Sequence, residues 1–175
     1  MDKNEFRKLC LKKLKKNSLA SNKIYLDFLV AKKLDKLIKE IKPKNILFYS
    51  ALKIEPNLEK LIKKYRVKTD IFLPFIEEKS FKMVKYRLPL KQDSFGVFSP
   101  KNSFLKQKDI DMIIVPVVGV DGNFKRVGFG KGMYDRFYEK LQKKPIVVFV
   151  QRQKCFTKEL LCDWHDIPCD FYITP

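Results

Sequence analysis

Short apolar segments alternate with segments of helical periodicity along most of this 175-residue chain, and this alternation constrains its fold most strongly. Apolar side chains recur every three or four residues in segments 3–16 and 21–41, a spacing that predicts amphipathic helices. A third helix is expected to open at Pro56, where proline is tolerated in the first turn, and a fourth to span residues 134–141. Apolar runs suited to buried strands lie at residues 46–50, 70–74, 81–88, 111–116, 145–150 and 171–174.

This order of elements predicts an α/β fold, a three-layer α/β/α sandwich with a mostly parallel central sheet of Rossmann-like type. Neither a repeat nor a linker-like segment divides the chain, so we expect one domain over residues 1–175. Ligands of such sheets bind beyond the carboxyl ends of the strands. Three segments that follow strands are therefore expected at the site: 50–56, 116–135 and 151–153.

The composition is typical of a globular protein, with 45% hydrophobic residues. No apolar run approaches the roughly 20 residues of a membrane helix, and the first residues lack the apolar core of a signal peptide. We therefore expect a cytoplasmic protein that does not bind membranes. The four cysteines form no CxxC pair, and neither their spacing nor that of His165 matches a zinc site, so we expect reduced thiols at Cys10, Cys155, Cys162 and Cys169.

The net charge of +18 indicates attraction to anions without identifying the anion. The lysines are spread over the chain, and no element interleaves arginines with aromatics as nucleic-acid surfaces do, so we expect no nucleic-acid partner. A basic nucleic-acid-binding domain is one alternative, which would bind polynucleotides with strong salt dependence. Another ATP or sugar-phosphate enzyme on the same fold is a second.

The segment Arg126-Val-Gly-Phe-Gly-Lys-Gly-Met-Tyr-Asp135 is the strongest candidate for a site. Gly128, Gly130 and Gly132 lie between a strand end and a helix start, where backbone N–H groups can approach an anion closely. Arg126 and Lys131 add full charges. The spacing is neither that of a Walker loop nor that of a dinucleotide-binding motif. The segment is interpreted either as a phosphate-binding loop or as a flexible loop with a helix cap.

Three other charged residues each have two interpretations. Asp135 lies in the first turn of a predicted helix, where it stabilises the helix dipole or binds Mg²⁺ beside phosphate oxygens. Arg7 borders an apolar helix stripe, where it extends to solvent or closes a pocket over an anion. Glu55 precedes Pro56, and its carboxylate either favours the helix N-terminus or accepts two parallel hydrogen bonds from a donor-rich heterocycle.

Taken in order, these motifs resemble the 5-formyltetrahydrofolate cyclo-ligase family, also called methenyltetrahydrofolate synthetases, over essentially the whole chain. The resemblance implies ATP-dependent closure of 5-formyltetrahydrofolate to 5,10-methenyltetrahydrofolate, with ADP and phosphate released and Mg²⁺ involved. It also implies the cyclo-ligase type of three-layer fold. The residues that carry it are Lys3, Arg7, Glu55, Val115-Pro116, Asp121, Arg126–Arg136, His165-Asp166, Asp170 and Thr174.

The resemblance assigns a role to each matching position. Arg126 and Lys131 would neutralise the transferred phosphoryl group. Glu55 and Tyr134 would contact the folate, and Asp135, with Asp166, would bind Mg²⁺. The nucleotide would be bound by Lys3, Arg7, Val127, Gly128, Phe129, Gly130, Lys131, Gly132, Met133, Tyr134 and Asp135.

The sequence departs from the family pattern at Met133, where an aromatic residue is usual, and at Ser99, where an acidic residue is common. Both changes concern the folate pocket rather than the cations that bind ATP. The glutamine expected after the strand at 145–150 is either Gln151 or Gln153. We expect a monomer whose substrate is 5-formyltetrahydrofolate, and the lysine-rich composition suggests the hypothesis that the substrate is polyglutamated.

Overall fold

A six-stranded sheet forms the centre of the protein, whose computed structural model describes residues 1–92, 98–101 and 108–175. The strand order is β10-β9-β6-β1-β2-β3, and all neighbours are parallel except the antiparallel pair β2 and β3. These strands are β1 (Asn45–Leu47), β2 (Asp70–Glu77), β3 (Ser80–Lys85), β6 (Met112–Pro116), β9 (Ile146–Val150) and β10 (Phe171–Ile173). Two small pairs join β4 (Lys91–Gln92) to β5 (Phe98–Ser99) and β7 (Gly119–Val120) to β8 (Arg126–Val127).

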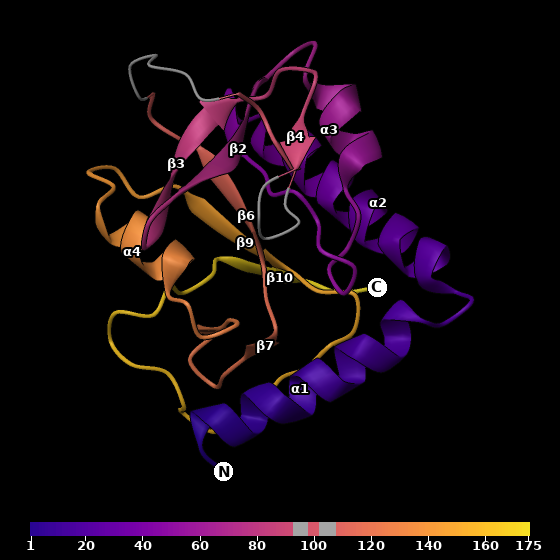
Figure 1. Cartoon of the computed structure of the whole chain (residues 1–175), viewed down its shortest axis with the longest axis vertical. Helices are drawn as coiled ribbons and strands as arrows, with labels where there is room; N and C mark the ends of the chain where they lie inside the picture. Colours follow the sequence, from indigo (N-terminus) through magenta and orange to yellow (C-terminus); the bar gives the residue numbers. More distant parts are fainter. Residues whose placement is uncertain (93–97, 102–107) are drawn as a thin grey trace.

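Helices cover both faces of the sheet, as Figure 1 shows. Helices α2 (Lys23–Ile41) and α3 (Glu59–Tyr65) pack on one face, and α4 (Met133–Glu139) packs on the other. Successive strand residues point to opposite faces, so Ile114 contacts the α2 side while Ile113 and Val115 contact the α4 side. The predicted three-layer α/β/α sandwich with a mostly parallel sheet is confirmed.

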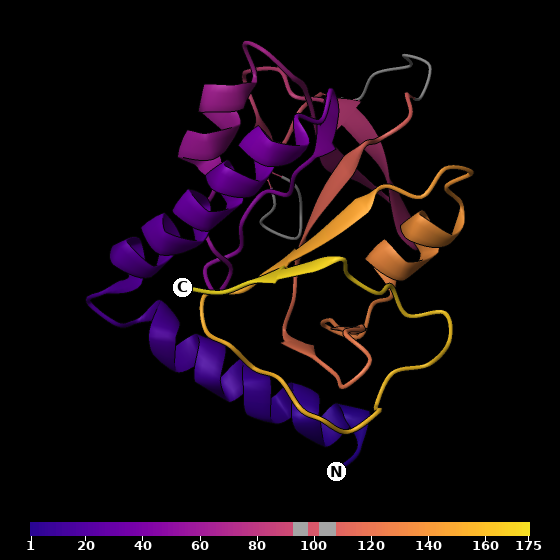
Figure 2. The same cartoon turned by 180° about the vertical axis from the view of Figure 1, so that it is seen from behind.

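Helix α1 (Lys3–Ser18) lies apart from these layers, across the end of the sheet where β6 leads into β7 (Figures 1 and 2). The side chain of Asp2 accepts hydrogen bonds from the first free N–H groups and, with Glu5, forms a capping box that defines where the helix begins. Phe6, Cys10 and Leu14 are buried against Val118, Val127 and Cys155. Leu9, another apolar residue of this helix, is 42% exposed.

Several predicted boundaries were wrong: the strand expected at residues 81–88 ends at Lys85, and the one expected at 70–74 extends to Glu77. Pro56 does not open α3, which begins at Glu59 because the Asn57 side chain accepts a hydrogen bond from the Glu59 N–H at 2.9 Å. The carbonyl of Pro56 instead accepts a hydrogen bond from the Tyr49 hydroxyl. The strand expected at residues 46–50 ends at Leu47. Among the described residues, no helix is long and apolar enough to cross a membrane.

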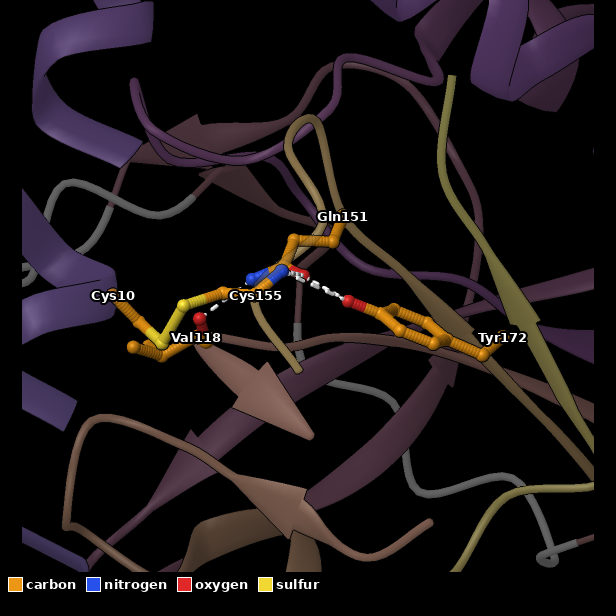
Figure 3. Close-up of a disulfide and its surroundings, with 5 residues drawn as sticks. All are labelled: Cys10, Val118, Gln151, Cys155 and Tyr172. Atoms are coloured by element: carbon orange, nitrogen blue, oxygen red, sulfur yellow. Dashed lines mark hydrogen bonds between the residues drawn. A yellow bond between two sulfur atoms is a disulfide. The ribbon is translucent and has the colours of Figure 1, made fainter. Parts of the chain in front are cut away.

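The cysteine prediction was wrong for two of the four residues. Cys10 and Cys155 form a disulfide between α1 and the segment after β9, as Figure 3 shows. Their Cα atoms are 5.8 Å apart, within the usual range for a disulfide. The two residues are 145 positions apart, so only the folded chain brings them together. Cys162 and Cys169 are free thiols.

Candidate functional site

Two adjoining cavities lie at the end of the sheet where α1 and the glycine loop meet. The first, here called the basic cavity, has a volume of about 340 Å³ and is lined by glycines, carboxylates and the side chains of Lys3, Arg7, Arg126 and Arg136. The second, the apolar cavity, has a volume of about 520 Å³. Arg126, Gly132 and Arg136 line both cavities. The apolar cavity is lined mainly by Tyr49, Leu52, Pro74, Ile76, Phe81 and Tyr134.

The glycine loop separates the two cavities and depends on glycine at several points. Gly130 and Gly132 have φ angles of 93° and 59°, which side-chain-bearing residues rarely adopt. A Cβ atom at Gly128 would lie 2.4 Å from Nη1 of Arg126, so this glycine makes room for the guanidinium. The guanidinium of Arg136 donates hydrogen bonds to the carbonyls of Lys79 and Lys131, and so fastens the loop to the β2–β3 hairpin.

Arg126 forms the common wall of the cavities. Arg126 is the first residue of strand β8, and its backbone N–H donates a hydrogen bond to the carbonyl of Ile167 at 3.0 Å. The side chain is 7% exposed, and its Nε donates to the carbonyl of Pro116 at 3.2 Å. Its guanidinium lies 4.8 Å from the centre of the Tyr134 ring and 4.0 Å from the Asp135 carboxylate. A positive charge is therefore held, already oriented, between the two cavities.

Helix α1 contributes two further cations to the basic cavity. Arg7 donates from Nε to the carbonyl of Gly128 at 2.7 Å, and its guanidinium is the nearest group to the position of a Cβ atom at Gly130. Lys3 hydrogen-bonds to the carboxylate of Asp166, with Asp163 3.5 Å away. Burial alone would lower the pKa of Lys3, but the hydrogen bond to Asp166 and the nearby negative charges raise it overall.

The position of α1 is fixed from behind the site by the Cys10–Cys155 disulfide (Figure 3). Gln151 holds the same segment, since it accepts a hydrogen bond from the Cys155 N–H and another from the hydroxyl of Tyr172, and donates to the carbonyl of Val118. Gln151 is fully buried and lines neither cavity, so its role in the described structure is to support the loops. Gln153, the other expected glutamine, lines neither cavity either.

Carboxylates gather on the far side of the basic cavity. Asp135 accepts a hydrogen bond from the Ile167 N–H at 3.2 Å, and Asp166 accepts one from the Asp163 N–H at 2.7 Å. The ligand atoms of Asp163, His165 and Asp166 lie within 4.8 Å of one another, a grouping that could hold a metal ion. Of the two residues predicted to bind Mg²⁺, Asp166 belongs to this group, and Asp135 lines the same cavity.

Glu55 projects into the apolar cavity and is only 8% exposed. Its Oε2 accepts one hydrogen bond, from the Leu52 N–H at 2.8 Å. Burial raises the pKa of this carboxyl from 4.5 to about 7, although the Leu52 hydrogen bond and the charges of Arg126 and Arg152 act in the opposite direction. Glu55 thus titrates near neutral pH and keeps hydrogen-bonding capacity for a ligand.

A buried ion pair beneath Glu55 was not predicted. Arg152 is 1% exposed and forms two hydrogen bonds with the carboxylate of Asp27 on α2, at 2.7 and 3.2 Å. It also donates to the backbone carbonyls of Lys53 and Glu55, and therefore fixes the loop that presents the Glu55 side chain. The sequence carries one signal of this pair, because Asp27 shares the buried stripe of α2 with Val30 and Leu34.

The structure divides the predicted site residues between three places. Val127 is fully buried under α1, and its side chain reaches neither cavity. Five others line the apolar cavity alone, whereas Arg126 and Gly132 line both cavities; the five are Glu55, Phe129, Lys131, Met133 and Tyr134. The basic cavity is lined by Lys3, Arg7, Arg126, Gly128, Gly130, Gly132, Asp135 and Asp166. Arg136, for which we predicted no role, lines both cavities.

Comparison with known proteins points to one family. A family model described as the 5-formyltetrahydrofolate cyclo-ligase family matches residues 1–175. A 5-formyltetrahydrofolate cyclo-ligase of Mycoplasma pneumoniae is 30% identical over 175 residues, which cover 99% of this chain and 98% of that protein. A 5-formyltetrahydrofolate cyclo-ligase of Haemophilus influenzae is 28% identical over 142 residues, 75% of this chain and 76% of that protein.

Solved structures agree with this result at the level of the fold. The NMR structure of an Aquifex aeolicus 5,10-methenyltetrahydrofolate synthetase superposes with a TM-score of 0.79 at 28% identity, covering 98% of this chain and 89% of that one. A 5,10-methenyltetrahydrofolate synthetase from Mycoplasma pneumoniae superposes with a TM-score of 0.74 at 23% identity, covering 99% of both chains.

Proposed function

The chain belongs to the 5-formyltetrahydrofolate cyclo-ligase family, and we propose that it closes the ring of 5-formyltetrahydrofolate to 5,10-methenyltetrahydrofolate with ATP, releasing ADP and phosphate. The observation that carries this proposal is the pair of adjoining cavities. One has the charge and the glycine backbone that a triphosphate requires, and the other has the apolar walls and the single buried carboxylate that suit a folate ring.

ATP binds in the basic cavity in this proposal. Lys3 and Arg7 reach the phosphates from α1, and the backbone at Gly128 and Gly130 approaches them closely. The terminal phosphate lies toward Arg126, since this guanidinium faces both cavities. Phosphoryl transfer needs little covalent assistance from a protein and depends mainly on positioning and charge, which these groups supply.

The donor set of the basic cavity fits Mg²⁺, which favours one or two carboxylates together with phosphate oxygens. Asp135 and Asp166 would hold the ion, with Asp163 beside them. When bound, Mg²⁺ would neutralise charge on the phosphate oxygens. The hydrogen bond between Lys3 and Asp166 keeps the phosphate-binding cation next to this carboxylate.

The pterin ring of the folate binds in the apolar cavity. Tyr134 and Phe81, whose ring centres are 5.0 Å apart, supply flat walls, and Met133 extends the surface with a flexible side chain. Glu55 accepts hydrogen bonds from the N–H groups of the ring. Lys79 also lines this cavity, where it would attract the glutamate tail of the substrate. The described chain supplies the lining of both cavities, so the proposal requires no second subunit.

The reaction joins the two cavities at Arg126. The oxygen of the formyl group that N5 carries attacks the γ-phosphorus of ATP. The bond between the γ-phosphorus and the oxygen that bridges it to the β-phosphate breaks, and ADP leaves. N10 then attacks the formyl carbon, loses its proton to solvent, and phosphate departs with the former formyl oxygen. The substrate supplies both nucleophiles, so the protein need only bind, orient and neutralise. We assign charge neutralisation to Arg126 and Lys131.

The direct test is to incubate the purified protein with 5-formyltetrahydrofolate and MgATP and to follow the near-ultraviolet absorbance of methenyltetrahydrofolate. An increase that requires both substrates is expected. A matched variant, Arg126→Lys, keeps the charge but loses the planar fork that spans the two cavities, and should be much slower. The proposal is wrong if the wild-type protein binds ATP but produces no methenyl product at any folate concentration.

A further inference from the structure

The basic cavity contains one feature that phosphate binding does not use, a large aromatic side chain exposed at its edge. Trp164 is 84% exposed although it lines the cavity. Its indole presents a wide, flat apolar surface, a kind of surface on which a nucleotide base can stack. Its neighbour His165 lines the same cavity, with ring centres 5.5 Å apart and ring planes at 86°.

The turn that carries Trp164 is held on several sides. Within the turn, the Asp166 carboxylate accepts the Asp163 N–H at 2.7 Å. Lys3 connects Asp166 to α1. Lys125, next to β8, donates from Nζ to the carbonyls of Asp163 and Trp164 at 2.6 and 3.1 Å. The backbone below the indole is therefore fixed while its ring faces solvent, so a flat ligand could cover the ring without rearranging the turn.

We propose that Trp164, with His165 edge-on beside it, is the stacking platform for the base of the nucleoside triphosphate. This inference rests on the proposed use of ATP. The other described groups that line the cavity are charged side chains and glycines, which suit phosphates, so Trp164 and His165 supply its aromatic rings. A base stacked at the edge would leave the triphosphate to run inward along the loop toward Arg126. Stacking is tolerant of base identity, because every purine has an aromatic face.

The single tryptophan of the chain makes this directly measurable, since the intrinsic fluorescence excited at long wavelength comes from Trp164 alone. Titration with ATP should quench or shift the emission, and GTP should do the same. Inorganic tripolyphosphate carries the charge without the base. It should compete with ATP for the cavity and leave the emission nearly unchanged. Equal quenching by tripolyphosphate and ATP would overturn the proposal.

Enzyme kinetics provide the second measurement. Trp164→Ala should raise KM for ATP about tenfold, in line with the stacking of one base, while kcat and KM for the folate stay close to wild type. Trp164→Phe should recover most of the affinity. Phe28→Ala is the matched control, because Phe28 is an exposed aromatic on α2 that lines neither cavity. It should leave KM for ATP unchanged.

The outcomes separate this inference from the proposed function. If methenyl product forms and Trp164→Ala leaves KM for ATP unchanged, the platform is wrong and the reaction stands. If ATP quenches the fluorescence but no methenyl product forms, the platform stands and the folate reaction is wrong. If ATP neither binds nor quenches, both are wrong.

Discussion

Glu55→Gln should stabilise the protein at alkaline pH even though it impairs folate binding. The wild-type side chain is a carboxyl 8% exposed, with one hydrogen bond and a pKa raised by burial from 4.5 to about 7. When the pH rises above 7, this group must ionise inside the protein, and the cost of the buried charge is subtracted from the stability of the fold. Glutamine has the same shape, can accept the hydrogen bond from Leu52, and never ionises.

The sign and the size follow from proton linkage. Between pH 4.5 and about 7 the folded protein binds more protons at Glu55 than the unfolded chain does, so this group's contribution to stability falls as the pH rises through that window. It is fully present below pH 4.5 and is lost above the folded pKa. One pKa unit corresponds to about 1.4 kcal/mol, so a rise from 4.5 to about 7 corresponds to roughly 3 kcal/mol. For a chain of this size that is roughly 6–12 °C in melting temperature.

The assay is urea denaturation of the wild type and of Glu55→Gln at several pH values from 4.5 to 8.5. The two proteins should be about equally stable at the acid end, and the variant should be more stable at the alkaline end. Glu59→Gln is the control, because Glu59 is an exposed glutamate on α3 and its replacement should change stability little at any pH. A stability difference between wild type and Glu55→Gln that does not change with pH would refute the reasoning.

Three further predictions concern the rest of the site. Lys131→Ala should lower kcat roughly 100-fold with little change in the urea midpoint, and an equal loss of stability and activity would indicate a structural lysine. Asp27→Asn should destabilise the protein by about 3–5 kcal/mol because Arg152 is left charged and buried. Asp27→Asn should also raise KM for the folate more than KM for ATP. Steady-state kinetics that show equal changes in the two KM values would contradict this prediction. Reducing the Cys10–Cys155 disulfide should lower the free energy of unfolding by about 2–5 kcal/mol and raise KM for ATP, whereas a Cys10→Ser variant should be insensitive to reductant.

The sheet and the glycine loop could be predicted because their signals are local. Each strand of the main sheet has its own apolar run, and Gly128, Gly130 and Gly132 lie within five residues of one another. Strands β7 and β8 could not be predicted, since two-residue strands have no periodicity and are defined here by pairing with each other and with segments distant in the sequence. The start of α3 was missed because the helix begins three residues after Pro56, where the Asn57 side chain accepts a hydrogen bond from the Glu59 N–H.

The parts of the site that were missed depend on contacts between distant segments. Arg152 and Asp27 are 125 residues apart, and neither position reveals its partner before the chain is folded. The disulfide is a similar case. The resemblance to the family assigned Lys131 and Met133 to the nucleotide, which stays a prediction, and in the structure both line the apolar cavity. A loop that forms a wall has two sides, and residue order does not reveal which side each side chain takes.

The environment of Glu55 also explains how the apolar cavity can select its ligand. The carboxylate can accept several hydrogen bonds, yet the structure gives it only the one from Leu52, in a place where water is largely excluded. Its neighbour Arg152 does not satisfy it, because that guanidinium is engaged by Asp27 and by backbone carbonyls. A ring with adjacent N–H donors supplies the missing hydrogen bonds. An analogue without them would leave a charge buried and unpaired, and sites of this kind reject such analogues by factors of roughly 10⁴–10⁵.

Because only the ionised form of Glu55 accepts two hydrogen bonds from adjacent N–H groups of the ring, the affinity for the folate should rise with pH through about 7. In the proposed site, the buried charge that lowers the stability of the fold would thus be the same charge that recognises the folate ring.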